Sequence, residues 1–311
     1  MINAKHYLLA SIHAALAAGD AILHVYHSSD FKVEAKDDSS PLTLADRRSH
    51  EIIAACLAGF AIPILSEEGR TIAYDDRKFW KTFFLIDPLD GTKEFIKKNG
   101  EFTVNIATIY ENKAVAGVVF VPDQNRLYFA AAGVGSFRVN AGQIDDALIR
   151  KSEFIGRLSR MSDRQAADLL SGLTGQSTRL PVEKPANRPF TIAGSRSHAT
   201  PELEAFVAQK RREYDKVEFI SAGSSLKLCL VAEGRADVYP RTGPTMEWDT
   251  AAGQAVVECS GGRVCRFDTA VPLRYNKKNL LNPWFLALHV DQLQSFWLNR
   301  MERFWTFSKT C

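Results

Sequence analysis

The sequence lacks a strong excess of charge of either sign. Its 311 residues include 39 lysines and arginines and 36 aspartates and glutamates, which gives a formal net charge of +3. A protein dedicated to nucleic acid usually presents a strongly basic face, so we expect no nucleic-acid partner. The small positive excess is compatible with an anionic small-molecule substrate but does not by itself argue for one.

Cysteine is scarce and has no pairing pattern. The five cysteines are odd in number and scattered, and no Cys-x-x-Cys motif occurs. A disulfide framework needs paired cysteines and a structural zinc site needs closely spaced ones, so both are disfavoured. Reduced, buried thiols of a cytoplasmic protein are the prediction. The cysteines are Cys56, Cys229, Cys259, Cys265 and Cys311.

Long hydrophobic runs are also missing. No uninterrupted run of 18 apolar residues occurs, so no membrane-spanning segment is predicted. Residues 1–20 have an apolar character, but His6, His13 and Asp20 interrupt them, and no basic region precedes a continuous apolar stretch as in a signal peptide. Hydrophobic residues make up 46% of the chain and charged residues 24%, proportions that are typical of a globular protein and exclude whole-chain disorder.

Hydrophobic periodicity in the first half predicts two helices followed by a sheet. Apolar residues at helical spacing predict one long amphipathic helix over residues 3–27 and a second helix that begins near Asp46. Short apolar runs bounded by turn residues then predict a largely antiparallel sheet, with a hairpin turn at residues 111–113. The runs cover residues 61–65, 82–86, 102–110, 114–121 and 126–132.

A polar stretch over residues 141–189 separates this half from one of different character. Strand-like and helix-like segments alternate after it, which indicates βα units. We therefore expect an α+β half at residues 1–145, an α/β half at residues 146–289 and a C-terminal extension at residues 290–311. The predicted strands cover residues 191–193, 217–220 and 236–239, and the predicted helices cover 201–212, 224–233 and 250–259.

The most informative segment is Asp-Pro-Leu-Asp-Gly-Thr at residues 87–92. An apolar strand runs into Asp87, and Pro88 favours an extended backbone there. Gly91 and Thr92 open a predicted helix, so two carboxylates lie beside the N–H groups of a helix start. Such N–H groups attract phosphate, whereas carboxylates repel it. One ligand can use both only if cations lie between the acids and the phosphate.

Three further segments place carboxylates at the ends of predicted elements. Glu67 and Glu68 follow a predicted strand, and Asp46 and Asp249 lie at predicted helix starts. Each of these taken alone is often only a helix cap or a solvated turn. Taken together, they form an all-oxygen set without histidine or cysteine, which suits a hard ion such as Mg²⁺ rather than zinc.

These motifs resemble the signatures of the inositol monophosphatase superfamily. Residues 65–68, 87–92 and 248–253 are similar to its three motifs, and the match is best with the CysQ branch, the 3'(2'),5'-bisphosphate nucleotidases. The resemblance covers about residues 1–285 and implies a layered αβαβα sandwich that joins an α+β region to an α/β region. Strings typical of the branch cover residues 87–95, 99–106, 193–198, 223–227 and 239–241.

The resemblance implies a magnesium-dependent, lithium-sensitive phosphomonoesterase with two or three ions. Glu67, Asp87 and the carbonyl of Leu89 would hold one Mg²⁺. Asp87, Asp90 and Asp249 would hold the second, and a third, weaker ion would lie near Asp90 and Glu67. The implied chemistry is sound, because a pair of ions stabilises both the attacking and the leaving oxygen of an in-line displacement.

The resemblance also implies which residues meet water and substrate. Thr92 and Asp46 would orient and deprotonate the attacking water, and the N–H groups of Gly91 and Thr92 would bind phosphate oxygens. His198 would lie near the adenine, and lysine and arginine suit a substrate with two phosphates. The implied substrate-binding residues are Gly91, Thr92, His198, Ser224, Lys227 and Arg241, with Glu67 and Asp249 at the border of the site.

By this resemblance the chain hydrolyses the 3'-phosphate of 3'-phosphoadenosine 5'-phosphate to AMP and phosphate, a reaction of sulfur metabolism. An inositol or sugar phosphate phosphatase of the same superfamily is the alternative within the enzymes, and a non-catalytic metal- or nucleotide-binding protein is the alternative outside them. A haloacid dehalogenase phosphatase is disfavoured, because residues 87–92 carry one extra residue between the acids and do not lie on the first strand. Both a monomer and a homodimer stay open.

The last 22 residues differ in character from the rest of the chain. Residues 290–311 mix aromatic side chains with basic ones, among them Trp297, Arg300 and Trp305. We expect an added helix packed on the core or a disordered extension. The alternative is a peripheral contact with the cytoplasmic face of the inner membrane, since aromatic and basic side chains suit the membrane interface.

Overall fold

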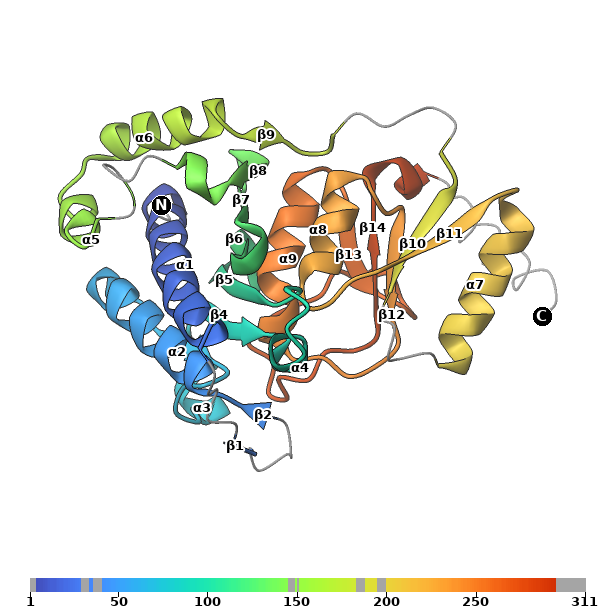
Figure 1. Cartoon of the computed structure of the whole chain (residues 1–311), viewed down its shortest axis with the longest axis horizontal. Coiled ribbons are helices and arrows are strands. Elements are labelled where there is room, and N and C mark those ends of the chain that lie inside the picture. Colours follow the sequence, from blue (N-terminus) through green and yellow to red (C-terminus); the bar gives the residue numbers. More distant parts are fainter. Residues whose placement is uncertain are drawn as a thin grey trace.

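Helices and sheets stack in five alternating layers (Figure 1). The structure is a computed structural model that describes residues 4–28, 34–35, 41–144, 149, 151–182, 188–194 and 200–294. Helices α1 and α2 cover one face of the larger sheet, α8 and α9 lie between the two sheets, and α7 covers the outer face of the smaller sheet. The layered αβαβα sandwich that the sequence resemblance implies is therefore confirmed.

The larger sheet has the strand order β3-β4-β5-β6-β7-β8-β9 within the described residues. Strands β3 and β4 are parallel, and the pairs from β4 to β9 are antiparallel. Glu111 and Asn112 form the predicted hairpin turn with φ of 46° and 63°, a conformation that suits a two-residue loop. The bounds are β3 Ile64–Ser66, β4 Thr82–Asp90, β5 Thr103–Tyr110, β6 Lys113–Val121, β7 Arg126–Ala131, β8 Gly135–Asn140 and β9 Thr178–Arg179.

The smaller sheet has the order β11-β10-β12-β14-β13 in the described part of the chain. Strand β10 is parallel to β11 and β12, as the predicted βα units require, whereas β14 is antiparallel to β12 and β13. The bounds are β10 Phe190–Gly194, β11 Val217–Ser221, β12 Val238–Arg241, β13 Arg263–Arg266 and β14 Phe285–Leu288, and a separate antiparallel pair consists of β1 Glu34–Ala35 and β2 Pro41–Leu42.

Helix starts follow local capping chemistry. Thr43 caps α2 and forms a capping box with Asp46, and Ser162 does the same for α6 with Gln165. Pro201 occupies the first turn of α7, where its missing N–H costs nothing. The bounds are α1 Ala4–Tyr26, α2 Leu44–Leu57, α3 Tyr74–Arg77, α4 Thr92–Ile96, α5 Phe154–Leu158, α6 Asp163–Gly175, α7 Pro201–Glu213, α8 Leu226–Glu233 and α9 Glu247–Cys259.

Helix α1 is long and apolar enough to cross a membrane by length and composition alone. In the structure 72% of the most apolar 18-residue stretch of α1 is buried, and the helix packs against α2 and strands β5 and β6. Leu9, Ile12 and Leu16 belong to the cluster between the helical layer and the larger sheet. This is the position of a core helix, and each such buried side chain contributes roughly 1.5–3 kcal/mol.

Helix α9 lies at the centre of the molecule, against β4, β5, β6 and β7 of the larger sheet and β13 and β14 of the smaller one. Gly117 of β6 permits this close packing, because a Cβ there would lie 2.4 Å from the carbonyl oxygen of Ala252 in α9. The close approach fixes the helix against the sheet. It therefore also fixes the N-terminal turn of α9, which carries Asp249.

Candidate active site

The end of β4 brings two acids to the same side of the sheet. Strict alternation would place Asp87 and Asp90 on opposite faces. The pairing of β4 with β5 is irregular between these residues. As a result, Leu89 packs with Phe84 and Ile86 in the hydrophobic cluster between α1 and the larger sheet. Both carboxyl groups therefore lie on the opposite face of the larger sheet, which faces α8 and α9. Pro88 helps this break, because it has no N–H for the ladder.

Helix α2 carries Asp46 to the same region. The Oδ2 of Asp46 accepts hydrogen bonds from the Thr43 N–H at 2.7 Å and the Thr43 hydroxyl at 2.5 Å. Its other oxygen accepts a bond from the Thr92 hydroxyl at 3.3 Å. Asp46 is buried, so the capping box leaves one oxygen directed at Thr92. The structure thus brings together the two residues that the resemblance assigns to the attacking water.

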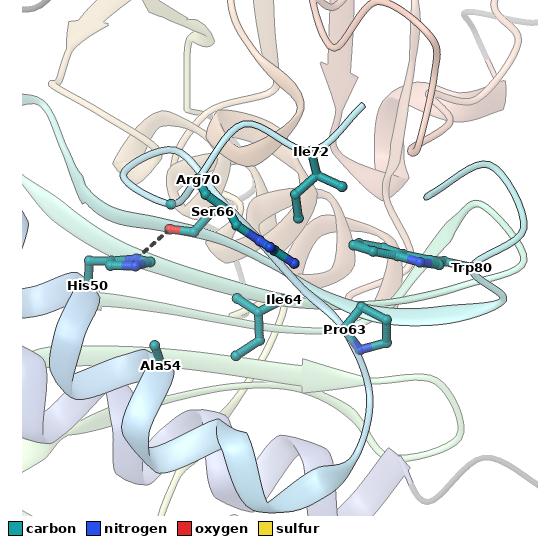
Figure 2. A pocket seen from close by; sticks show the side chains of 9 residues that line it. His50, Ala54, Pro63, Ile64, Ser66, Arg70, Ile72 and Trp80 are labelled. Atoms are coloured by element: carbon teal, nitrogen blue, oxygen red, sulfur yellow. Dashed lines mark hydrogen bonds between the residues drawn. The ribbon is translucent and has the colours of Figure 1, made fainter. Parts of the chain in front are cut away.

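The same helix supports both neighbouring acidic segments. Ser49 donates from its hydroxyl to the carbonyl of Pro88 at 2.7 Å, and His50 Nδ1 lies 3.0 Å from the Ser66 hydroxyl. Figure 2 shows this second contact at one end of a hollow, with Ile64 and Trp80 along the rest of it. The first contact holds the end of β4 against α2, and the second holds Ser66, the residue before Glu67, against the same helix.

Three acids from distant parts of the chain converge. One carboxylate oxygen each from Glu67, Asp87 and Asp249 lies within 4.8 Å of the others. Burial raises the pKa of Asp87 well above its usual value, and the neighbouring charges of Glu67 and Asp90 raise it further. Burial, followed by the charge of Asp90, also raises the pKa of Asp249. Like charges held this close in a desolvated site favour a proton or a cation between them.

This cluster fits a hard divalent ion. Its donors are carboxylate oxygens, which Mg²⁺ prefers. Burial and the neighbouring carboxylates raise the pKa of Asp87 and of Asp249, so a cation between these acids would favour their ionised forms. Asp90 lies beside the cluster, held by the Ser225 N–H at 2.7 Å and the Ser225 hydroxyl at 3.0 Å.

Ser225 and Asn105, to which the sequence motifs assign no role, link the acids to each other. The Ser225 hydroxyl lies 2.7 Å from the carbonyl of Asp249 and 3.0 Å from Asp90 Oδ2. The Asn105 amide donates to Ser225 Oγ at 2.9 Å and to Asp90 Oδ2 at 3.3 Å. Both residues lie inside strings typical of the branch, at residues 223–227 and 99–106, which was the available signal.

A cavity opens beside the acids, between the end of β4 and the inner helices. Its lining includes Asp90, Gly91 and Asp249 together with Ser224, Lys227 and Arg241. The Ser224 hydroxyl contacts the carbonyls of Asp90 and Glu101 at 2.8 and 2.7 Å. Apart from His198, the predicted substrate-binding residues of the second half therefore share one cavity with Asp90, Gly91 and Asp249.

Lys227 is more buried than an ordinary helix lysine. Its Nζ donates to the carbonyls of Ala222 and Ser224 at 3.0 and 2.8 Å and lies 5.5 Å from the ring centre of Tyr239. Burial lowers its pKa to about 8, although the charge of Asp90 acts in the opposite direction. A cation is thus placed at the wall of the cavity and is held there by backbone oxygens.

Two predictions fall on residues that the structure does not describe. His198 lies within residues 195–199, and most of the C-terminal extension lies within residues 295–311, both outside the described ranges. The adenine contact and the role of the extension stay predictions.

Known proteins that are similar to this chain belong to the family that the motifs around the acids resemble. The model of the inositol monophosphatase family matches residues 3–289. The chain is 40% identical over 272 residues to the 3'(2'),5'-bisphosphate nucleotidase CysQ of Escherichia coli K12, covering 86% of this chain and 94% of that protein. The crystal structure of CysQ from Bacteroides thetaiotaomicron aligns with a TM-score of 0.76 and 45% identity over 91% of this chain and 97% of that one. An IMPase from Thermotoga maritima, 19% identical, shares the fold with a TM-score of 0.63 over 92% of each chain.

Proposed function

The chain belongs to the inositol monophosphatase family, and we propose that it is a 3'(2'),5'-bisphosphate nucleotidase that removes the 3'-phosphate of 3'-phosphoadenosine 5'-phosphate. The observation that carries this proposal is the convergence of Glu67, Asp87 and Asp249 beside a cavity lined by Lys227 and Arg241. A phosphate ester with a second anionic group suits such a pairing of acids with fixed cations.

In the proposed reaction, Asp46 and Thr92 prepare the water. Thr92 donates to Asp46 in the structure, so its hydroxyl oxygen can accept a hydrogen bond from water and point that water toward phosphorus. Asp46, through Thr92, takes up the proton that the water loses. The N–H groups of Gly91 and Thr92 open α4 and hold the phosphate oxygens, because a helix start carries partial positive charge.

We propose that Glu67, Asp87, Asp90, Asp249 and the carbonyl of Leu89 hold two or three Mg²⁺ ions. Ions of this kind lower the pKa of a water molecule and offset the charge of a phosphate ester. The donor set supports Mg²⁺ over zinc, since it is built from oxygens. Lithium would inhibit by occupying one of these positions.

The proposed division of labour follows the two halves of the chain. Residues 1–145 supply most of the acidic ligands, and residues 146–289 supply Ser224, Lys227 and Arg241 for the second phosphate and the nucleoside. The proposed location is the cytoplasm, where reduced cysteines persist. An inositol or sugar phosphate remains the competing substrate, because its phosphate would meet the same acids.

A substrate panel tests the proposal. Phosphate release is measured with Mg²⁺ from 3'-phosphoadenosine 5'-phosphate and from inositol 1-phosphate, each with and without lithium. We expect the nucleotide to be the better substrate and lithium to inhibit. Preference for inositol 1-phosphate would replace the proposed substrate, and no release from either would refute the enzyme assignment.

Asp90→Asn is the matching variant. It keeps the size of the side chain and its contacts with Ser225, but it removes one of the proposed ligand charges. Activity is expected to fall to near background while the circular dichroism spectrum stays unchanged. Asp168→Asn, the same substitution at an exposed position in α6, is the control and should keep full activity. Turnover retained by Asp90→Asn would contradict the proposed metal site.

A further inference from the structure

We propose that Glu247, which the reaction does not use directly, is a positioning residue that fixes Asp249 and ties it to the segment carrying Glu67. This inference rests on the proposed metal site. Glu247 is the first residue of α9, two positions before Asp249, and its side chain is fully buried. A buried glutamate so close to a functional acid requires a structural explanation, because an unpaired buried charge is very costly.

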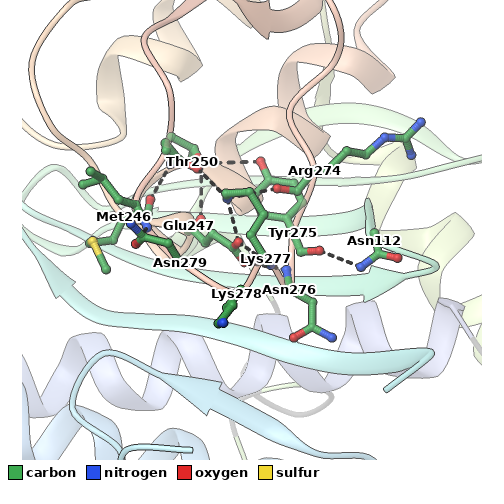
Figure 3. Close-up of polar contacts among 12 residues, drawn as sticks. Asn112, Met246, Glu247, Thr250, Arg274, Tyr275, Asn276, Lys277, Lys278 and Asn279 are labelled. Atoms are coloured by element: carbon green, nitrogen blue, oxygen red, sulfur yellow. Dashed lines mark hydrogen bonds and ion pairs between the residues drawn. The ribbon is translucent and has the colours of Figure 1, made fainter. Parts of the chain in front are cut away.

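Three donors converge on this carboxylate. Oε2 accepts from the backbone N–H of Asn276 at 2.6 Å, and Oε1 accepts from the backbone N–H of Lys277 at 2.9 Å and from its ammonium group at 2.6 Å. Figure 3 shows Glu247 between the start of α9 and the loop that contains these residues. Both oxygens of the Glu247 side chain accept hydrogen bonds. A carboxylate has two acceptor oxygens, whereas an amide would present an NH₂ donor to one of these donors.

The same loop holds the start of α9 at further points. The backbone N–H of Glu247 donates to the carbonyl of Leu280 at 3.0 Å, and the Asn282 amide donates to the carbonyl of Met246 at 2.6 Å. The Met246 N–H in turn donates to Asp249 Oδ2 at 2.8 Å. The loop at residues 276–282 therefore controls the orientation of the Asp249 carboxylate through the first turn of the helix.

A second arm of the network reaches helix α3, which follows the loop that carries Glu67. The side chain of Asn276 accepts from Arg77 Nη1 at 2.7 Å and donates to the carbonyl of Arg77 at 2.7 Å. Arg77 is buried at the end of α3, ten residues after Glu67 along the chain. Acids brought from two distant segments must keep a fixed separation to share an ion. The hydrogen bonds from Arg77 through Asn276 to Glu247 tie the start of α9 to α3, and the chain between Glu67 and Arg77 links that restraint to the acid.

The test compares metal affinity with turnover. The full-length protein is titrated with Mn²⁺, with free ion followed by electron paramagnetic resonance, and with Mg²⁺ in activity assays. Glu247→Gln places an amide donor against the loop donors, and we expect metal affinity to fall about 10-fold, in the range seen when residues that support metal ligands are changed. The kcat at saturating Mg²⁺ should largely recover, which a general loss of folded protein would not allow.

Two further variants complete the test. Glu202→Gln, the same substitution in the first turn of α7 at an exposed position, should bind metal as the wild type does. Asn276→Gly keeps the backbone N–H bound to Glu247 and the positive φ of 67°, but removes both side-chain bonds to Arg77. Asn276→Gly should also weaken Mn²⁺ binding by several-fold. If Glu247→Gln does not fold, the Mn²⁺ affinity of Asn276→Gly tests whether this network positions the metal site.

The outcomes separate this inference from the proposed function. If the wild type binds Mn²⁺ and the folded variants bind it equally well, Glu247 does not position the site and the inference is wrong, while the metal site stands. If Asn276→Gly alone leaves the affinity unchanged, the arm to the Glu67 segment is refuted. If the wild type binds no Mn²⁺, both the metal site and the inference fail.

Discussion

At the scale of single residues, the site depends on acids that are unfavourable without a partner. Asp87 is buried beside Glu67, Asp90 and Asp249, and burial, followed by the charges of the neighbouring acids, raises the pKa of Asp87 and of Asp249. Asp46 differs from them, because donors from Thr43 and Thr92 already satisfy it. The two environments favour two roles, a cation site for the crowded acids and a proton acceptor for Asp46.

The hydroxyl of Thr92 gives a direct test of the second role. Thr92→Val keeps the shape of the side chain but cannot connect a water molecule to Asp46, so kcat should fall by about 10²–10⁴-fold, the usual contribution of general acid–base catalysis. Steady-state kinetics with 3'-phosphoadenosine 5'-phosphate measure the change, and KM should move far less. Thr92→Ser restores the hydroxyl and should recover most of the rate. A Thr92→Val enzyme with normal kcat would remove Thr92 from the mechanism.

At the scale of elements, local signals predicted more than long-range pairing did. The apolar runs and the turn at Glu111 and Asn112 identified strands β3 to β7, and the capping residues placed Asp46 and Asp249 at helix starts. Strands β1, β2, β8, β9, β13 and β14 and helices α3, α5 and α6 were missed. Strand β9 has two exposed residues and exists through its pairing with β8, and β13 and β14 pair with each other across a long loop.

The site was predicted where its residues form short motifs and missed where they act across the fold. The motif at residues 87–92 gave the acids and the turn, because the strand, the proline and the helix start are adjacent in sequence. Ser225, Asn105 and Glu247 work through contacts with residues far away along the chain. These contacts appear only in the folded structure, although Ser225 and Asn105 lie inside strings typical of the branch.

The turn between β4 and α4 has no room for a single added carbon at Gly91. Gly91 has φ of 90°, and a Cβ there would lie 2.1 Å from the Ser224 hydroxyl. Gly91→Ala should therefore cost more than the roughly 1–2 kcal/mol of left-handed strain and should displace Ser224 from the cavity wall. Gly133→Ala is the matched control, since Gly133 has φ of 78° with nothing within 4 Å of its Cβ. Urea unfolding measures the stability of both variants, and phosphate release measures their activity. If Gly91→Ala loses no more stability than Gly133→Ala and keeps its activity, the close approach of Gly91 to Ser224 is unimportant.

At the scale of the whole molecule, the site joins the larger sheet to the central helix α9. Glu67 and Asp87 belong to the larger sheet and its loops, whereas Asp249 lies in the first turn of the central helix α9, which also contacts the smaller sheet. Burial and like charge oppose this assembly at neutral pH, and packing of α9 against both sheets holds it together. An ion shared by these acids would stabilise the native state, because the unfolded chain has no such site.

The stability of the protein should therefore depend on both pH and metal. A raised pKa in the folded state means that Asp87 and Asp249 favour folding while protonated, so the metal-free protein should lose stability as pH rises from about 4 through their raised values. Mg²⁺ binds the ionised acids, so the difference in Tm between samples with Mg²⁺ and with EDTA should grow over the same range. At an ion concentration 100 times Kd the added stability is about 2.7 kcal/mol. Calorimetry measures both curves, and Asp87→Asn is the control, which should be less destabilised by rising pH without metal and should gain less from Mg²⁺. A Tm that ignores Mg²⁺ at every pH would contradict a site assembled from both halves of the chain.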